Sequence, residues 1–483
     1  METFAGFLSQ TDHHFGRVLD FIEQLGELDN TLVIVVSDNG ASAEGGVHGT
    51  RNEMLMANAY PQRLEDNVEV IDEWGGVNLH AHYAWGWTWA GDTPFRRWKR
   101  ETYRGGITDP CVVSWPDGIS SANEVRDQYT HAIDIVPTIL DAIGLEPPQA
   151  IRGVSQSTIQ GHSFAHTFDA PDAAGRHTTQ YFEMMGHRSI FDDGWKAVCP
   201  WPAPSMTEAE EMGRPFLFTA ITADIIDELD ASGWELYHVS EDRAECHNVA
   251  DQHPEKLEQM IRRWWTEAGR YDALPVASID VGRFIADRPS YQGSRDRFVY
   301  LPGASPIPYF ETPRFFNRTY AITADVAVPD ATTEGVLLAH GSRHGGHALY
   351  VKDRRLHYVY NFLGFEVFKI SSVEPIPVGR VQLRMEFEPT GFLDLSKGTG
   401  TPGCVRLLCD KRLVGVGDLE RTVPAFFGTS TLACGYDANG SVSPGDYEAP
   451  FRFTGEIDQV TLDLSGELTV LPEAEVQRVM AQQ

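Results

Sequence analysis

The feature that most constrains the fold of this chain is a short apolar run that ends in polar residues. Residues 31–40 read Thr-Leu-Val-Ile-Val-Val-Ser-Asp-Asn-Gly. An uninterrupted apolar run of this length, closed by a turn signal, is typical of a strand buried on both faces of a parallel sheet. In open α/β sheets, ligands bind beyond the carboxyl ends of the strands. We therefore expect Asp38 and Asn39 to lie where such a fold builds its site.

The chemistry of these two residues indicates a divalent metal. A carboxylate and an amide carbonyl are hard oxygen ligands, which suit Ca²⁺ or Mg²⁺ and match a soft metal poorly. Because Ca²⁺ usually takes about six to eight oxygen ligands, Asp38 and Asn39 would supply only part of a site. Taken alone, the tripeptide Asp-Asn-Gly is more typical of an ordinary turn after a strand than of a metal site.

Several longer stretches resemble the type I sulfatases of the alkaline phosphatase superfamily, in particular their bacterial arylsulfatase branch. The resemblance extends over roughly the first 275 residues. It is carried by residues 7–26, 38–46, 71–76, 82–87, 90–95, 98–99, 105–106, 113–116 and 131–138, and it ends near 235–237 and 248–250. It implies an enzyme that hydrolyses sulfate esters, either of small molecules or of glycans.

The resemblance also implies roles for individual residues. Asp38 and Asn39 would bind the metal, usually calcium in this family, and Lys99 would bind the oxygens of the sulfate ester. A metal and a cation both stabilise the negative charge that develops on a sulfuryl group in its transition state. Without the flanking Thr-Pro-Phe and Gly-Gly, Lys99 would read as a solvated lysine in the basic run 96–100.

Histidines supply weaker candidates. His82 lies in an aromatic segment between the metal pair and Lys99, where it could contact substrate or donate a proton, or could simply pack within a loop. His13 and His14 fall in a predicted amphipathic helix and are interpreted as helix-surface or packing residues. His48 follows the metal turn in a glycine-flanked loop, where a histidine is commonly inert.

One departure from the family concerns the nucleophile. Type I sulfatases carry Cys-x-Pro-x-Arg or Ser-x-Pro-x-Arg, whose first residue becomes formylglycine. No serine and none of the six cysteines begins that motif here, the cysteines being Cys111, Cys199, Cys246, Cys404, Cys409 and Cys434. The two early aspartates that complete the family's metal site are also absent, because residues 1–30 offer a helix and no strand.

These absences lead to a hypothesis about the chain as a whole. We expect it to be the carboxyl-terminal portion of a sulfatase, from a truncated or split gene or a late-assigned start codon. Alone it would be inactive, and it would expose sheet edge and apolar surface that a complementary amino-terminal half or an oligomer could cover. Two alternatives stay open: a phosphonate or phosphate ester hydrolase of the same superfamily, and a non-catalytic remnant that binds metal or glycan.

The pattern of elements predicts two domains. Residues 1–275 are predicted to form an α/β sulfatase domain, incomplete at its amino terminus, with a small antiparallel sheet after the main one. Residues 276–483 are predicted to be an all-β domain with its linker, because strand follows strand with alternating apolar residues. Residues 345–361 are similar to concanavalin-like sandwich or jelly-roll domains. The aromatic residues there are interpreted as core rather than as a sugar platform: Tyr358, Tyr360, Phe362 and Phe365.

Composition limits the kinds of partner that the chain could bind and the cellular compartment in which it could lie. A net charge of −30, with no basic stripe beyond residues 96–100, argues against nucleic acid as a partner. No stretch has the length of apolar residues that a membrane span needs, and the first residues lack the basic start of a signal peptide. Six scattered cysteines form no dense disulfide framework, so a cytoplasmic location is predicted.

Overall fold

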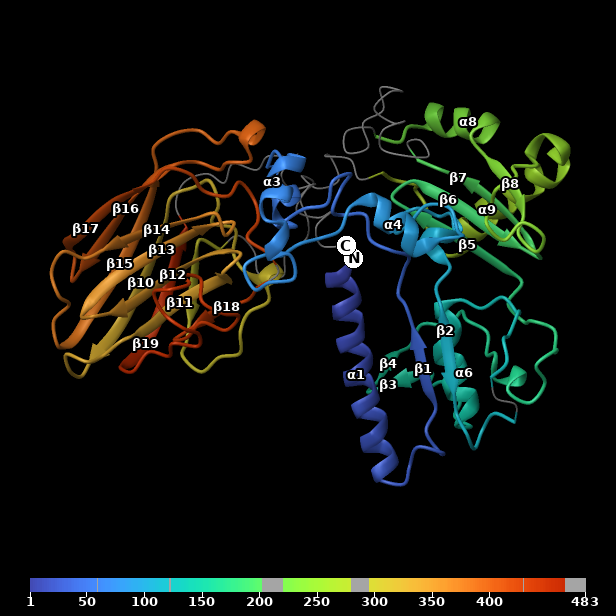
Figure 1. Ribbon diagram of the computed structural model, residues 1–483, viewed down its shortest axis with the longest axis horizontal. Coiled ribbons are helices and arrows are strands. Elements are labelled where there is room, and N and C mark those ends of the chain that lie inside the picture. The colour runs from blue at the N-terminus through green and yellow to red at the C-terminus, as the bar shows by residue number, and fades with distance from the viewer. Residues whose placement is uncertain (59, 121–122, 202–219, 279–294, 429, 465–483) are drawn as a thin grey trace. The chain divides into compact units, whose positions relative to one another are not determined.

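The computed structural model describes residues 1–58, 60–120, 123–201, 220–278, 295–428 and 430–464 (Figure 1). The chain forms two compact units, the first from Met1–Ala43 and Gly86–Ile279, the second from Glu44–Trp85 and Asp280–Gln483. The predicted division at 275/276 lies close to the last passage between the units. Residues 44–85, which the sequence assigned to the first domain, pack with the second unit instead.

The first unit begins with a helix that buries none of its side chains. This helix, α1, spans Glu2–Gln24, so the amphipathic helix predicted there is present. Its apolar residues nevertheless face outward, and Phe7 and Phe21 are 70% and 60% exposed. His13 and His14 are exposed on the same helix. An apolar stripe of this kind is usually covered in a folded protein.

The apolar run within residues 31–40 forms a strand, but its pairing and exposure differ from the prediction. Strand β1 (Val33–Val36) pairs with β2 (Cys111–Ser114), and the two run antiparallel with Val33 opposite Ser114. Val35 and Val36 are 42% and 45% exposed. The prediction of a parallel strand buried on both faces is therefore wrong. Within the described residues β2 is the one strand that pairs with β1, so β1 lacks the second neighbouring strand that a central strand of a sheet would have.

The rest of the first unit contains the small antiparallel sheet that the sequence predicted. Its strands are β5 (Thr179–Met184), β6 (His187–Asp192), β7 (Trp195–Cys199) and β8 (Glu235–His238), in that order across the sheet. Helix α9 (Pro254–Arg270) packs against them and places Trp264 in their core. Among the described residues this unit also contains α4 (Trp85–Asp92), α5 (Arg104–Ile107), α6 (Ile135–Ala142), α8 (Ala223–Ser232), β3 (Ala150–Ile151) and β4 (Val154–Ser155).

The second unit is built from two antiparallel sheets. A six-stranded sheet has the order β17-β16-β15-β10-β19-β9, and a five-stranded sheet has the order β14-β13-β12-β11-β18. Apolar residues of both sheets belong to one hydrophobic core. The strands are β9 (Arg297–Tyr300), β10 (Tyr320–Val328), β11 (Gly335–Ser342), β12 (Gly345–Lys352), β13 (Arg355–Phe362), β14 (Glu366–Ser371), β15 (Gly379–Pro389), β16 (Gly403–Cys409), β17 (Arg412–Leu419), β18 (Leu432–Cys434) and β19 (Glu456–Leu464).

Residues 44–85 are an integral part of this second unit. They carry the short helices α2 (Met54–Ala57) and α3 (Leu64–Glu69), and Met54 and Leu55 are buried in the core shared by the two sheets. Asn58 is fully buried. Its amide nitrogen donates to the carbonyl of Phe426 at 2.7 Å, and its amide oxygen accepts the backbone N–H groups of Ala425 and Phe426.

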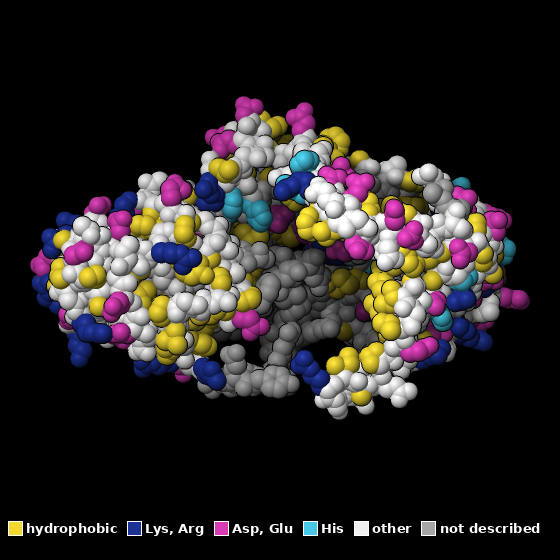
Figure 2. All heavy atoms as spheres, turned by 90° about the horizontal axis from the view of Figure 1, so that it is seen from below, with side chains coloured by type: hydrophobic (Ala, Val, Ile, Leu, Met, Phe, Trp, Pro, Cys, Tyr) yellow, Lys and Arg dark blue, Asp and Glu magenta, His cyan; other side chains and the backbone are white. Residues whose placement is uncertain are grey.

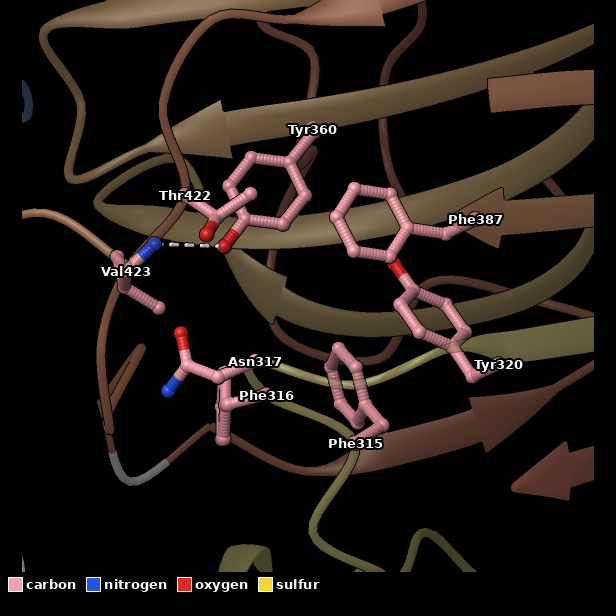
Figure 3. Close-up of a pocket in the computed structure, with 8 residues that line it drawn as sticks. All are labelled: Phe315, Phe316, Asn317, Tyr320, Tyr360, Phe387, Thr422 and Val423. Atoms are coloured by element: carbon pink, nitrogen blue, oxygen red, sulfur yellow. Dashed lines mark hydrogen bonds between the residues drawn. The ribbon is translucent and has the colours of Figure 1, made fainter. Parts of the chain in front are cut away.

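The aromatic residues of the second unit fill its interior. Tyr358, Tyr360 and Phe362 are buried, which confirms their interpretation as core, and Phe365 packs against that core while partly buried. Figure 3 shows a cavity beside Tyr360, whose hydroxyl accepts the N–H of Val423 at 2.8 Å. The cavity holds about 10 Å³, room for one water molecule, so it is a packing defect and not a ligand pocket.

The surface carries both signs of charge. On the face in Figure 2, acidic and basic side chains are interspersed with apolar ones. In the part of the chain that the structure describes, no helix combines the length and apolar character needed to cross a bilayer.

Candidate active site

The residues predicted to bind metal form the turn that follows β1. The Ser37 hydroxyl donates to the carbonyl oxygen of Asn39 at 3.1 Å, which closes the turn. The amide nitrogen of Asn39 donates to Oδ1 of Asp38 at 2.7 Å, and the Asp38 side chain is exposed. This hydrogen bond occupies the nitrogen end of the Asn39 amide, so its carbonyl oxygen is the atom that could serve a metal.

The segment that carries Lys99 lies directly against this turn. The backbone N–H of Lys99 donates to the carbonyl of Ala41 at 3.2 Å, and that of Gly40 donates to Gly106 at 3.4 Å. A Cβ on Gly40 would stand 1.7 Å from the carbonyl oxygen of Gly105, so only glycine permits this approach. Two segments about sixty residues apart, both singled out in the sequence, are thus neighbours in the first unit.

A hydrogen-bonded network fastens the Lys99 segment to the small sheet. Arg96 donates from Nη1 to the Tyr237 hydroxyl at 2.6 Å, and its guanidinium lies over the ring of Tyr103, 4.7 Å from the centroid. Oε2 of Glu235 accepts both tyrosine hydroxyls, at 2.8 Å from Tyr103 and 2.5 Å from Tyr237. Burial, followed by the charge of Glu235, raises the pKa of both tyrosines, which keeps them protonated as donors.

Two further carboxylates lie near the metal turn and were assigned no role from the sequence. Asp92 accepts the N–H of Ala41 at 2.9 Å through Oδ1, while its buried Oδ2 has no hydrogen-bond partner among the described residues. Burial raises the pKa of Asp109 to about 6, and the negative charges of Asp92 and Asp38 add to the shift. The Gly-Asp-Thr-Pro stretch at residues 91–94 belongs to the resemblance to sulfatases and could have indicated Asp92 as a site residue. No sequence pattern indicated Asp109.

The donor set of this region fits a hard divalent cation. Asp38, Asn39 and Asp92 present carboxylate or amide oxygens, the ligands that Ca²⁺ and Mg²⁺ prefer. The orphaned oxygen of Asp92, and the repulsion of the Asp109 carboxylate by the charges of Asp92 and Asp38, are what a bound cation would relieve. Within the described residues no group of three or more His, Cys, Asp or Glu side chains is arranged closely enough to hold a metal by itself. Asp38, Asn39 and Asp92 therefore fit one part of a divalent-metal site and do not complete it.

His82 belongs to the second unit. Its Nε2 stands 4.0 Å from Oε2 of Glu44, and its Nδ1 lies 3.0 Å from the carbonyl of Tyr83. The backbone of His82 pairs with that of Thr50 in both directions, at 2.9 Å each way. With a side chain only 10% exposed, His82 is largely packed in its own unit, and a contact with substrate stays a prediction.

Comparison with known proteins defines the class to which the first part of the chain is related. Residues 1–145, which include Asp38, Asn39, His82 and Lys99, match the family model described as Sulfatase. An uncharacterized sulfatase of Schizosaccharomyces pombe is 28% identical over 266 residues, which are 55% of this chain and 42% of that protein. The resemblance to the type I sulfatases of the alkaline phosphatase superfamily is thus confirmed.

Two further relatives have named activities. An arylsulfatase of Klebsiella aerogenes is 25% identical over 171 residues, 33% of this chain and 34% of that protein. The N-acetylgalactosamine-6-sulfatase of Homo sapiens is 28% identical over 148 residues, 30% of this chain and 21% of that protein. The chain therefore spans less than half the length of these curated relatives.

Proposed function

We propose that this chain carries the metal-binding and sulfate-binding part of an enzyme that hydrolyses sulfate esters. The observation that supports this most directly is the backbone contact between the Asp38–Asn39 turn and the Lys99 segment, made by the hydrogen bond from Lys99 N to Ala41 O. In this proposal Asp38 and Asn39 bind the cation, with Asp92 close by, and the Lys99 ammonium binds the sulfate oxygens. A bound calcium, or magnesium, would supply positive charge against the oxygens of the ester.

The nucleophile in this proposal is a formylglycine, and the chain has no Cys-x-Pro-x-Arg or Ser-x-Pro-x-Arg from which to make one. The proposal thus expects the chain alone to bind metal and sulfate without turnover. We propose that a complementary polypeptide half supplies the nucleophile and covers the apolar side of α1 and the faces of the β1–β2 sheet. The 70% and 60% exposure of Phe7 and Phe21 supports such a partner.

The substrate class is a sulfated glycan or an aryl sulfate, because the relatives include enzymes named for each. A phosphonate or phosphate ester is the alternative within the superfamily, since a metal and a lysine would serve that chemistry equally. We further propose that the second unit is a concanavalin-like sandwich. Its two antiparallel sheets and shared core support this architecture. A cytoplasmic location also stays a proposal, supported by six cysteines that are all free thiols.

Calcium titration of the chain by calorimetry tests the metal assignment without requiring turnover. We expect the native chain to bind Ca²⁺ and the variants Asp38→Ala and Asn39→Ala to lose at least about tenfold in affinity, because each removes an oxygen ligand. Asp72→Ala, an exposed acidic residue of the second unit, is the matched control and should bind as the native chain does. Unchanged affinity in Asp38→Ala would show that the metal assignment is wrong.

The sulfate assignment has its own test. With Ca²⁺ present, inorganic sulfate should bind the native chain, and Lys99→Met should weaken that binding by about tenfold or more, since it removes a charge-assisted contact. Binding that is tighter for phosphate and for phosphonate monoesters than for sulfate esters would favour the alternative chemistry. Calcium binding with no measurable affinity for any of these anions would favour a non-catalytic remnant.

A further inference from the structure

The interior of the second unit contains two histidines whose ring nitrogens have no hydrogen-bond partner. His340 on β11 and His347 on β12 are cross-strand neighbours, and the two residues are 1% and 2% exposed. All four ring nitrogens are buried, and none has a partner among the described residues. Buried polar atoms are nearly always paired in native proteins, so this exception points to a bound group such as a water molecule or an ion.

Aromatic rings enclose the pair. The ring of Phe315 lies 4.7 Å from that of His347, and the ring of Tyr309 lies 5.4 Å from that of His340, measured between centroids. Phe427 lies beside both histidines, with centroid distances of 5.8 Å to His340 and 6.0 Å to His347. An aromatic face can accept one N–H of an imidazole, but it offers nothing to the lone pair of the other nitrogen.

The two imidazoles are in the form that binds metals. Burial lowers the pKa of both histidines, so each ring is neutral and keeps one nitrogen lone pair. The ring centroids are 5.8 Å apart, with 82° between planes. A metal–nitrogen bond is about 2.0–2.1 Å long, so two imidazoles that share one ion have centroids roughly 5–6 Å apart. The His340 and His347 rings are separated by a distance of that size.

We propose that His340 and His347 bind a monovalent soft metal ion, Cu⁺, in the core of the second unit. Copper accepts imidazole nitrogen as a ligand, and Cu⁺ is stable with only two ligands. Within the described residues no group of three or more His, Cys, Asp or Glu side chains is arranged to hold a metal, so the site has these two protein ligands.

The surroundings of the pair favour a single positive charge over two. No carboxylate contributes to the pKa of either histidine, so no counter-charge lies close to them. The cost of moving an ion out of water rises with the square of its charge, which makes a divalent cation about four times as costly here as a monovalent one. The faces of the surrounding aromatic rings attract a cation and offset part of the remaining cost.

Cu⁺ itself is the probe. It is supplied to the full chain without oxygen, with ascorbate, and is buffered by the chelator bicinchoninate, after the exposed thiols of Cys111 and Cys246 have been alkylated. The native chain should retain one Cu⁺ against the chelator, and X-ray absorption should show nitrogen and no sulfur around the copper. His340→Leu and His347→Leu should each lower the affinity by about tenfold or more, because each removes one of the two ligands.

His357→Gln is the matched control. His357 is a buried histidine on β13 of the same sheet, but its ring nitrogens are paired with the Ser371 hydroxyl at 2.7 Å and the Lys352 carbonyl at 3.1 Å. This variant should bind Cu⁺ as the native chain does. A second readout needs no variant: in the native chain Cu⁺ should shift the ring nitrogen resonances of His340 and His347 and leave those of His357 in place.

Three outcomes would overturn the inference. A native chain that does not retain Cu⁺ would leave water or aromatic contacts as the partners of the ring nitrogens. Retention by both leucine variants, with sulfur around the copper, would mean that thiols bind the ion. Zn²⁺ binding of equal affinity that depends on the same two histidines would refute the assignment to a monovalent ion.

The inference does not depend on the proposed function. His340 and His347 belong to the second unit, whereas Asp38 and Asn39 belong to the first. Calcium binding by His340→Leu should therefore equal that of the native chain, and Cu⁺ binding by Asp38→Ala should be unchanged. Loss of Cu⁺ binding in Asp38→Ala would contradict a site made by the two histidines alone.

Discussion

Lys196 and Glu245 form a buried ion pair in the first unit, with 2.6 Å between Nζ and Oε1. The side chains are 3% and 0% exposed. The second oxygen of Glu245 accepts the N–H of Arg104 at 2.8 Å, at the start of the helix that follows the Lys99 segment. Burial lowers the pKa of Lys196, and the charge of Glu245 and its hydrogen bond to the ammonium oppose that shift. The pair therefore connects the small sheet to the chain that carries Lys99.

Lys196→Met should lower the free energy of unfolding of the first unit by about 3–5 kcal/mol, because it removes the ion-pair partner of the buried Glu245 carboxylate. Urea denaturation followed by circular dichroism measures this. The control is Arg262→Met, which removes a partner from the exposed pair Arg262–Glu258 and should cost about 0.5 kcal/mol or less. Equal losses in the two variants would contradict a structural role for the buried pair.

Gly40→Ala should separate the metal turn from the Lys99 segment. The new methyl group would meet the backbone carbonyl of Gly105, which cannot rotate away, so we expect a loss of about 1–3 kcal/mol in stability and a weaker affinity for Ca²⁺. Gly16→Ala, on α1 with open space around it, is the matched control. That change should be neutral or stabilising by up to about 1 kcal/mol, since alanine is the better helix former. A Gly40→Ala variant that binds Ca²⁺ with native affinity and stability would refute the close approach.

The residues proposed for the site stand out in the sequence, and their roles stay predictions, whereas the pairing of the strand before them was not predicted. Asp38, Asn39 and Lys99 were recognisable because each is surrounded by residues with a specific pattern, and the structure brings their two segments together. The partner of β1 was not recognisable, because an apolar run does not specify which strand pairs with it or in which direction. The exposure of Val35 and Val36 depends on what covers the sheet, and no local pattern encodes that.

The second unit should lose stability in mild acid. His340 and His347 lie opposite each other on β11 and β12, both buried, and none of their ring nitrogens has a hydrogen-bond partner among the described residues. Burial lowers the pKa of His340 to about 3 and that of His347 well below its usual value. Their stabilising contribution is complete above about pH 6.5, where both states are neutral, and falls as the pH drops towards 3, because only the unfolded chain then binds the protons.

The expected magnitude is about 2 kcal/mol per histidine between pH 7 and pH 5. Urea denaturation at these two pH values measures it, and the double variant His340→Leu/His347→Leu isolates the contribution of the pair from that of other ionisable groups. The variant should show a smaller loss of stability over this interval than the native chain. A loss of the same size in both proteins would mean that the two histidines do not titrate as described.

The apolar face of α1 should be accessible to a hydrophobic dye when the chain is alone. Replacing Phe7 and Phe21 by serine should reduce the fluorescence of bound anilinonaphthalene sulfonate and increase solubility, because both rings face outward. Phe392→Ser removes a single ring that is 96% exposed in the second unit, and this control should change dye binding much less, since an isolated apolar residue makes no patch. Equal dye binding by native chain and double variant would show that α1 is covered.

The unit to which residues 44–85 belong could not be predicted from their position in the sequence. The boundary near residue 275 was predicted from a change in the sequence pattern, from mixed helices and strands to strands alone. The division of the structure lies close to it. Met54, Leu55 and Asn58 gave no comparable signal, because an apolar pair and an asparagine in a short helix are compatible with either unit. Only their burial against Phe426 and its neighbours assigns them to the second unit.

That placement also constrains how the gene can be divided. The chain leaves the first unit after the metal turn, completes the core of the second unit, and returns before it reaches Lys99. A protein truncated at residue 275 would keep Met54 and Leu55 but discard the sheets that bury them, and it would expose the loop between its two site segments to proteolysis. The two-sheet unit is therefore not a detachable appendage, and we expect the two units to be inherited, expressed and engineered as a pair.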